Sequence, residues 1–311
     1  MRLQRPKIVV IGSLNVDHTL RVSHIPAPGE TLTATAAFMS LGGKGANQAL
    51  AAARAGGDVT LIGCVGDDDF GTRCIEHLRR EGIHIGAIMK DGPSTSCAFI
   101  TVDDAGENSI VVSPGANHAL MPMHVEEHAA LIRSTAALLL QLECPLPTVL
   151  HSIRIAAAVG VPVILNPSPL TAELIQARVE VDTLILNAQE AATLVSMTLA
   201  EIAANPQRAR AAAHCRQMSI TRGGDPTLVI TESAILSVAP PQVTPVDTVG
   251  AGDAFAGAFT VASATGMALE EAIRFANAAG ALATQGRGAQ PSIPGRDAIL
   301  ALAGQRSGST A

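Results

Sequence analysis

Short apolar runs that alternate with alanine-rich stretches of helical spacing constrain the fold of this chain more than any other feature. Residues 7–11 and 59–65 are the first two runs, and residues 45–55 and 69–80 carry the helical spacing. This alternation is typical of a parallel sheet covered by helices on both faces. We therefore predict a three-layer α/β/α fold with a mostly parallel central sheet. The later strand candidates are 137–142, 162–165, 183–186 and 219–220, and the later helix candidates include 147–159 and 207–216.

The composition indicates a large buried core and excludes several classes of partner. The 311 residues are 48% hydrophobic and 15% charged, with a formal net charge of −6. An acidic chain with scattered cations has no long-range attraction for nucleic acid or anionic lipid. The five cysteines lack C-x-x-C spacing, residues 1–11 form no signal-peptide core, and no apolar run approaches the length of a membrane span. We expect a cytoplasmic protein with no nucleic-acid or membrane partner and a frayed tail at 305–311.

Residues 96–112 interrupt the alternation. Two arms, 97–102 and 109–112, flank a turn-rich segment and are apolar on both faces. We predict that this hairpin attaches to the edge of the α/β body, where one face covers a ligand and the other meets a second subunit. An ordinary hairpin within the core is the alternative, and the pattern alone does not separate the two.

The strongest local signal for chemistry is the run Gly250, Ala251, Gly252 and Asp253, which opens a helical stretch that extends to Ala264. Small residues at a helix start leave backbone N–H groups accessible, and the helix dipole adds positive potential there. Such a tip can hold a transferring phosphoryl group. The same potential keeps the Asp253 carboxylate ionised and able to accept a hydroxyl proton. The alternative is a glycine-rich turn in which Asp253 only caps the helix.

A second glycine-rich turn, Gly42-Gly43-Lys44-Gly45, also opens a helical stretch. It is not a Walker A loop, because Gly45 follows Lys44 where Ser or Thr is required. No G-x-G-x-x-G follows a strand either, which removes the main argument for a dinucleotide-dependent dehydrogenase. The turn presents Lys44 and Asn47 to a polar partner, although such a turn, taken alone, is more often structural.

Together, in this order and at this separation, the two turns resemble the PfkB carbohydrate kinase family. The resemblance extends from Val10 to Pro294 and includes further motifs at 12–18, 26–31, 141–143, 166–169, 187–190 and 288–292. It implies one domain over 1–311, with lid segments at about 14–40 and 95–113 inserted in the α/β body. The implied activity is ATP-dependent phosphorylation of a small sugar. The family members that convert D-ribose to D-ribose 5-phosphate are the most similar.

The resemblance also implies roles for particular residues. Asp253 would be the general base, and the amides of Gly250, Ala251 and Gly252 would form the anion hole. Carboxylates and amides placed after strands can pair with sugar hydroxyls, and their burial is tolerable when a polyol satisfies them. For Asp17 and Glu143 the alternative is a solvated carboxylate at a strand end. The implied sugar contacts are Asn15, Asp17, Gly43, Lys44, Asn47, Glu143 and Asp253.

The implied cofactors are ATP, Mg²⁺ and an activating K⁺. Asn187 and Glu190 would help to organise Mg²⁺ and phosphate, although they also match a helix N-cap with its N3 glutamate, and the two roles can coexist. The implied nucleotide contacts are Asn187, Glu190, Thr221, Gly223, Gly224, Gly252 and Asn277. The implied monovalent cation site comprises Asp247, Val249, Ala283, Gly286, Gly288 and Ser292.

One position departs from the family pattern. Pro226 stands where relatives usually place a glycine, in the loop expected over the nucleotide. Proline fixes φ and removes an N–H donor, so the nucleotide preference is less firmly implied than the sugar.

Several alternatives remain open at this level. The acceptor could instead be deoxyribose, fructose, a nucleoside or a sugar phosphate, although the chain has no Tyr or Trp for stacking and few cations near the expected pocket. A catalytically silent sugar-binding regulator would be expected to have a damaged anion hole or base. His124 and His128 have the spacing of a metal pair but no evident third ligand, so a solvated helix face is favoured. Homodimerisation through the lid is a further expectation.

Overall fold

A nine-stranded sheet forms the centre of the computed structural model, which describes residues 5–304, so the tail expected at 305–311 lies outside the described residues. Its strands are β1 (Lys7–Ile11), β4 (Asp58–Val65), β5 (Ile88–Lys90), β8 (Ala137–Leu140), β9 (Val163–Leu165), β10 (Val181–Asn187), β11 (Cys215–Arg222), β12 (Asp225–Thr231) and β13 (Ile235–Val238). The order is β13-β12-β11-β10-β9-β8-β1-β4-β5. The strands from β11 to β5 are parallel, and β12 and β13 add an antiparallel edge.

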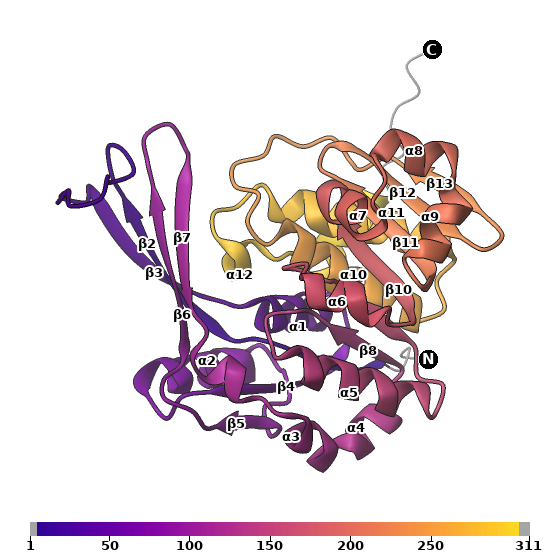
Figure 1. The fold of residues 1–311 in the computed structure, drawn as a ribbon, viewed down its shortest axis with the longest axis horizontal. Coiled ribbons are helices and arrows are strands. Elements are labelled where there is room, and N and C mark those ends of the chain that lie inside the picture. Colours follow the sequence, from indigo (N-terminus) through magenta and orange to yellow (C-terminus); the bar gives the residue numbers. More distant parts are fainter. Residues whose placement is uncertain (1–4, 305–311) are drawn as a thin grey trace.

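Helices cover both faces of this sheet (Figure 1). One layer contains α1 (Lys44–Arg54), α2 (Asp69–Arg80), α10 (Ala251–Ala264), α11 (Leu269–Ala283) and α13 (Arg296–Ala303). The other contains α3 (Pro122–Glu127), α4 (Ala129–Arg133), α5 (Leu146–Ala157), α6 (Ala172–Ala177), α7 (Ala188–Val195), α8 (Leu199–Ala204) and α9 (Pro206–Ala212). Ile8 and Val10 of β1 pack into the first layer, and Val9 and Ile11 into the second. The predicted three-layer fold with a mostly parallel sheet is confirmed.

The boundary between α9 and β11 differs from the sequence expectation. The helix expected at 207–216 ends at Ala212, and Cys215 already begins β11. His214, between them, has a φ of 52°, a left-handed conformation that cannot continue a helix. The segment carries no glycine or proline as a stop signal, so the periodicity alone extends the helix too far. Among residues 5–304, no helix combines the length and the hydrophobicity needed to cross a bilayer.

A second sheet projects from this body and contains the hairpin expected at 96–112 (Figure 1). Its strands are β2 (Asn15–Arg21), β3 (Ala36–Gly42), β6 (Ser96–Val102) and β7 (Asn108–Ser113), in the order β3-β2-β6-β7. We refer to these four strands as the projecting sheet. Every residue of β7 is exposed, so the hairpin is not part of the core. The large exposed apolar side chains of the sheet are Leu20, Phe38, Met39, Phe99, Ile110, Val111 and Val112.

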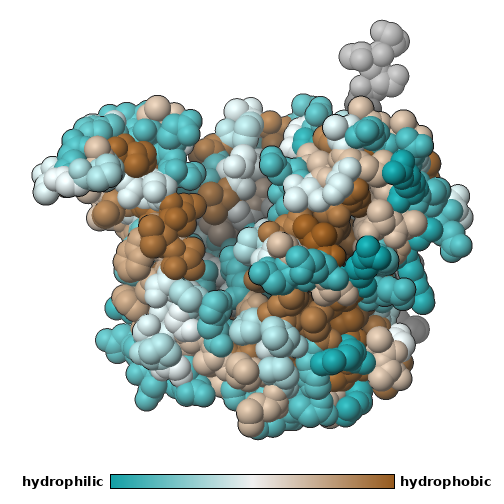
Figure 2. Space-filling model, viewed as in Figure 1, coloured by the Kyte–Doolittle hydropathy of each residue, from teal (hydrophilic) through white to brown (hydrophobic). Residues whose placement is uncertain are grey.

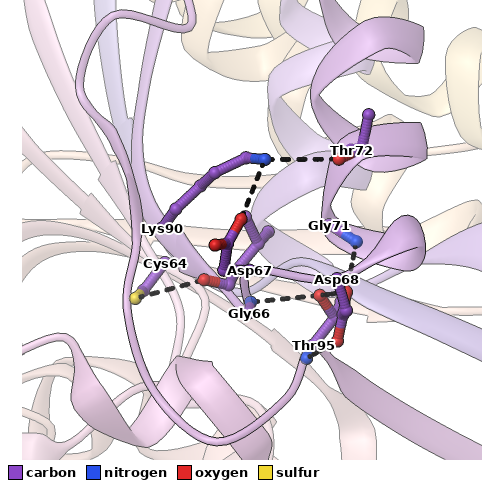
Figure 3. Close-up of polar contacts among 9 residues, drawn as sticks. Cys64, Gly66, Asp67, Asp68, Gly71, Thr72, Lys90 and Thr95 are labelled. Carbon is purple, nitrogen blue, oxygen red and sulfur yellow. Dashed lines mark hydrogen bonds and ion pairs between the residues drawn. The ribbon is translucent and has the colours of Figure 1, made fainter.

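A compact set of hydrogen bonds joins the root of the projecting sheet to the body (Figure 3). Asp68 caps α2 by accepting from Gly71 N at 2.7 Å. The same carboxylate accepts from Thr95 N at 2.7 Å and from Thr95 Oγ1 at 2.6 Å, just before β6 begins. Thr95 Oγ1 in turn accepts from Gly66 N at 3.1 Å. The Asp68 carboxylate therefore ties the start of β6 to the start of α2.

Candidate active site

The start of α10 is open at its tip. Gly250 precedes the helix with a φ of 80°, and a β-carbon there would lie 2.9 Å from Ala289, so both conformation and space require glycine. The amides of Gly250 and Gly252 form no hydrogen bond with any residue from 5 to 304, whereas Ala251 N donates to Thr248 O at 3.3 Å. No atom lies within 4 Å of the place that a Gly252 β-carbon would take. The tip therefore offers two free N–H donors to an approaching anion.

Asp253 lies one residue further, in the first turn of α10, and is only 6% exposed. Its Oδ2 accepts from Asn47 Nδ2 at 2.9 Å, and its Oδ1 accepts from Gln48 Nε2 at 2.9 Å. Both donors belong to α1, which can approach α10 closely because Gly257 has no side chain where Ala51 crosses it. Two amides thus orient the carboxylate, and each oxygen keeps a lone pair for another partner.

The second glycine turn begins α1 beside this carboxylate. Gly43 has a φ of 90°, and a β-carbon there would lie 2.7 Å from Asn15 N. The turn brings Asn47 to Asp253, and Asn47 Oδ1 is buried without any hydrogen-bond partner in the described residues. A buried acceptor with no donor is costly unless a ligand supplies one.

Glu143, which follows β8, reaches the same turn. Its Oε2 accepts from Lys44 N at 3.0 Å and from Ser13 Oγ. Burial would lower the pKa of Lys44, but the carboxylates of Asp253, Glu143 and Glu190 outweigh it, so the pKa is raised. The Lys44 ammonium therefore lies within electrostatic reach of all three carboxylates. Ser13 was not among the predicted site residues, although it lies within the motif at 12–18.

Asp17 and Asn15 enter the site from β2. Burial and the nearby Glu143 carboxylate raise the pKa of Asp17 to about 6. Gly42 of β3, which pairs with Asn15, leaves room for the Asp17 carboxylate, because a β-carbon there would lie 2.3 Å from Asp17 Oδ2. Asn15 Oδ1 accepts from Asn117 Nδ2 at 2.7 Å. The buried Asn117, from the 3₁₀ helix Gly115–Ala119, was also missed, since only the fold brings it to Asn15.

Asn187 and Glu190 form a capping box at the start of α7. Glu190 N donates to Asn187 Oδ1 at 2.8 Å, and Asn187 N donates to Glu190 Oε2 at 2.9 Å. Both side chains are partly free, and Glu190 acts electrostatically on Lys44. Asn187 and Glu190 therefore do cap α7. They lie at the carboxyl end of β10, where α7 begins.

The remaining predicted nucleotide residues lie around the β11–β12 hairpin. Gly223 and Gly224 form its two-residue turn, with Gly223 at a φ of 62° and open space around both glycines. Thr221 Oγ1 donates to Leu186 O at 3.3 Å. Pro226 lies in β12, and its carbonyl accepts from Arg222 Nε at 2.7 Å. The proline therefore leaves the hairpin intact.

Asn277 is less available than the other predicted nucleotide contacts. Its Oδ1 accepts from Thr227 Oγ1 at 2.7 Å, and its Nδ2 donates to Val238 O at 3.0 Å. The side chain is 5% exposed. These contacts join α11 to β12 and β13, so Asn277 has a structural role whatever else it contacts.

The predicted monovalent cation residues converge next to the tip of α10. Asp247 accepts from Val249 N at 3.0 Å and from Gly288 N at 2.8 Å. Ser292, in the short helix α12 (Ala289–Ser292), donates to Gly288 O at 2.6 Å. Gly286 is close to the same serine, since a β-carbon there would lie 2.7 Å from Ser292 Cβ. Ala283 ends α11 just before this loop. One carboxylate, one hydroxyl and several carbonyl oxygens are the ligand types that suit a hard cation.

The His124 and His128 pair does not form a metal cluster. His124 Nδ1 accepts from Met121 N at 3.1 Å at the start of α3, and His128 separates α3 from α4. Within residues 5–304, no group of three or more His, Cys, Asp or Glu side chains is arranged to hold a metal ion.

Comparison with known proteins finds similarity over nearly the whole chain. The model of the pfkB family carbohydrate kinases matches residues 5–296. Ribokinase from Haemophilus influenzae is 37% identical over 305 residues, covering 95% of this chain and 98% of that protein. Deoxyribokinase from Salmonella typhimurium is 34% identical over 295 residues, covering 92% and 95%.

A solved structure of Arabidopsis thaliana ribokinase, complexed with ribose and ATP, is similar in fold. It superimposes with a TM-score of 0.88 at 30% identity, covering 97% of this chain and 100% of that one. The architecture is therefore a ribokinase-like α/β fold.

Proposed function

Because the chain belongs to the pfkB family of carbohydrate kinases, and is thus a sugar kinase, we propose that it transfers the γ-phosphate of ATP to the primary hydroxyl of D-ribose, giving D-ribose 5-phosphate. One observation supports the proposal: the start of α1 contacts both carboxylates, since Asn47 Nδ2 donates to Asp253 Oδ2 at 2.9 Å and Lys44 N donates to Glu143 Oε2 at 3.0 Å. The candidate base and the proposed sugar pocket therefore share one helix start, next to the two free amides of the α10 tip.

Asp253 acts as the general base in this proposal. The fixed carboxylate accepts the proton of the primary hydroxyl as the hydroxyl oxygen attacks the γ-phosphorus, while the bond from the γ-phosphorus to the β,γ-bridging oxygen breaks and ADP leaves. The free amides of Gly250 and Gly252 stabilise the charge on the transferring phosphoryl group, aided by the dipole of α10. Because these donors are in place before reaction, positioning and charge stabilisation supply most of the rate.

The sugar is held by buried and half-buried polar groups, of which the Asn47 Oδ1 has no hydrogen-bond partner in the described residues. The Asn47 Oδ1 accepts a sugar hydroxyl, and Asp17 and Glu143 accept two more, with Asn15, Gly43 and Lys44 completing the pocket. Buried carboxylates favour an acceptor with several hydroxyls over an apolar one. This supports a free pentose as the acceptor.

The nucleotide lies along the carboxyl ends of β10 and β11, near Asn187, Thr221, Gly223, Gly224 and Asn277. Glu190 would help to hold Mg²⁺, which would neutralise part of the phosphate charge. K⁺ in the Asp247 loop supports the geometry of the α10 tip, which is adjacent in sequence. We expect turnover to require Mg²⁺ and to rise with K⁺, and Asp247→Asn to remove the K⁺ response.

The projecting sheet covers the sugar and joins two copies of the chain in this proposal. The face with Asp17 also carries Phe38, Ile110 and Val112, and the opposite face carries Phe99 and Val111. Water-exposed apolar side chains on both faces of one sheet are unfavourable unless each face meets a partner.

Deoxyribose is the second candidate acceptor, favoured by the 34% identity to a deoxyribokinase. It differs from ribose by one hydroxyl. A site built to hydrogen-bond that hydroxyl discriminates strongly against the sugar that lacks it, because the buried partner is left unpaired.

The acceptor is tested by coupled ADP formation with Mg²⁺ and ATP, using ribose, 2-deoxyribose, fructose and adenosine in parallel. The proposal predicts that ribose gives the highest kcat/KM. A higher value for 2-deoxyribose would transfer the assignment to the second candidate. No increase over basal ADP formation with any sugar, combined with a ribose-induced thermal shift, would instead indicate a silent sugar-binding protein.

A further inference from the structure

Behind Asp253 lies a chain of buried side-chain amides that no substrate contact explains. Gln48 Nε2 donates to Asp253 Oδ1 at 2.9 Å and to Asn166 Oδ1 at 3.0 Å. Gln48 Oε1 accepts from Gln141 Nε2 at 2.8 Å. Gln48 is 0% exposed and Gln141 is 1% exposed. Both hydrogens and one lone pair of the Gln48 amide are therefore used inside the protein.

The direction of this chain is set by the backbone. Asn166 Nδ2 donates to Ile185 O in β10 at 2.9 Å, and a carbonyl can only accept. Asn166 must then present its oxygen to Gln48, and Gln48 must present its NH₂ group. The end of the chain that reaches Asp253 is consequently always a donor.

Two positions near this chain of amides have no space for a side chain and are occupied by glycine. A β-carbon at Gly12 would lie 2.0 Å from Gln141 Oε1, and one at Gly45 would lie 2.4 Å from the Gly12 backbone. Glycine just after β1 and at the start of α1 thus leaves space for the Gln141 side chain and for the close approach of the two backbone segments. Gln141 Oε1 is buried and has no hydrogen-bond partner among the described residues. The need to pair buried polar atoms therefore does not by itself explain why these amides are there.

We propose that Gln48, directed by Asn166 and supported by Gln141, is a positioning residue that fixes the reactive orientation of the Asp253 carboxylate. This inference rests on the proposed function, because it assigns Asp253 as the base. Gln48 does not contact the sugar. Its loss therefore lowers the rate of phosphoryl transfer without changing sugar affinity.

The test compares three variants in the full chain. Gln48→Met keeps the length of the side chain and removes the donor. It is expected to lower kcat about 10- to 100-fold, the range for losing one hydrogen bond to a charged group, with an unchanged KM for ribose. Gln141→Met leaves the Gln48 donor in place and is expected to lower kcat less than Gln48→Met does. Thr148→Val is the matched control, because it removes a buried hydrogen bond from Thr148 Oγ1 to Leu120 O, and Thr148 belongs to α5 in the helix layer on the other face of the sheet from α10.

A double-mutant cycle with Asp253→Asn separates positioning from general destabilisation. If Gln48 acts through Asp253, Gln48→Met adds little further loss of kcat once Asp253 is replaced. Multiplicative losses, or a kcat for Gln48→Met equal to that of Thr148→Val, would overturn the inference. If the wild-type protein forms no sugar-dependent ADP, the proposed function is wrong. If the wild-type protein is active and Gln48→Met leaves kcat unchanged, only the role of Gln48 is wrong.

Discussion

In the nine-stranded sheet every residue of β8 is buried, whereas in the projecting sheet every residue of β7 is exposed. Both strands are rich in Leu, Ile or Val, so hydrophobicity alone does not distinguish them. The chain covers the first sheet with its own helices and leaves the second uncovered, and Figure 2 shows apolar side chains along the projecting sheet. The helices of the body bury its own sheet, whereas a ligand or a second copy is proposed to cover the projecting sheet. We expect substitutions in the body to change stability and kcat, and those in the projecting sheet to change KM and assembly.

A matched pair of isoleucines gives the largest expected contrast. Ile62 in β4 is 0% exposed and Ile110 in β7 is 53% exposed. Ile62→Ala should lower the free energy of unfolding by about 2–5 kcal/mol, because it leaves a cavity. Ile110→Ala should lower it by less than about 1 kcal/mol. Urea denaturation of both variants measures the difference, and equal losses would show that the projecting sheet is as well packed as the body.

The outer face of the projecting sheet is tested by placing a charge on it. Val111 is 67% exposed, on the face that carries Phe99. Val111→Asp should weaken dimerisation by about 2–4 kcal/mol, because an unpaired carboxylate would be buried between subunits. Light scattering against concentration measures the change, with circular dichroism as the folding control. A wild-type chain that is monomeric at all working concentrations would remove this role for the sheet.

Asp17 belongs to the projecting sheet but lies near Glu143 of the body, and its raised pKa predicts how stability changes with pH. Its pKa in the folded protein is about 6, above the ordinary value of 3.8, so the folded state holds this proton to higher pH than the unfolded state. Its contribution to stability is therefore fully present below about pH 4 and is lost as pH rises to about 6. Asp17→Asn should stabilise the ligand-free protein at pH 8 by about 1–2 kcal/mol, after allowance for partial exposure, while raising KM for ribose. Thermal melts from pH 4 to 8 that are parallel for both proteins would contradict this.

The smallest effect is expected at the capping box of α7. Asn187→Ala removes the side-chain acceptor for Glu190 N and should cost about 1 kcal/mol of stability. Because the same element lies at the proposed nucleotide end, KM for ATP should rise while KM for ribose stays constant. Thr198→Ala at the capping box of α8 is the control, since it should cost similar stability without any change in KM.

Sequence patterns predicted the layers of the body because burial on both faces imposes continuous apolar strands, as in residues 7–11. They also marked the two glycine turns, because positive φ and close approach leave glycine as the only suitable residue, and Asp253 follows one of these turns. The role of Asp253 as the base stays a prediction. They could not find Asn117, Ser13 or the role of Gln48. Those side chains act through partners about 100 to 200 positions away, such as Asn15, Glu143 and Asp253, and only the folded topology brings them together.

The central claim is that the α10 tip and Asp253 perform the chemistry while other residues hold the sugar. The most direct measurement combines single-turnover phosphoryl transfer with calorimetric ribose binding in Asp253→Asn. We predict a loss of turnover of about 10²- to 10⁴-fold with ribose affinity within a few-fold of wild type. Undiminished turnover in this variant would contradict the account.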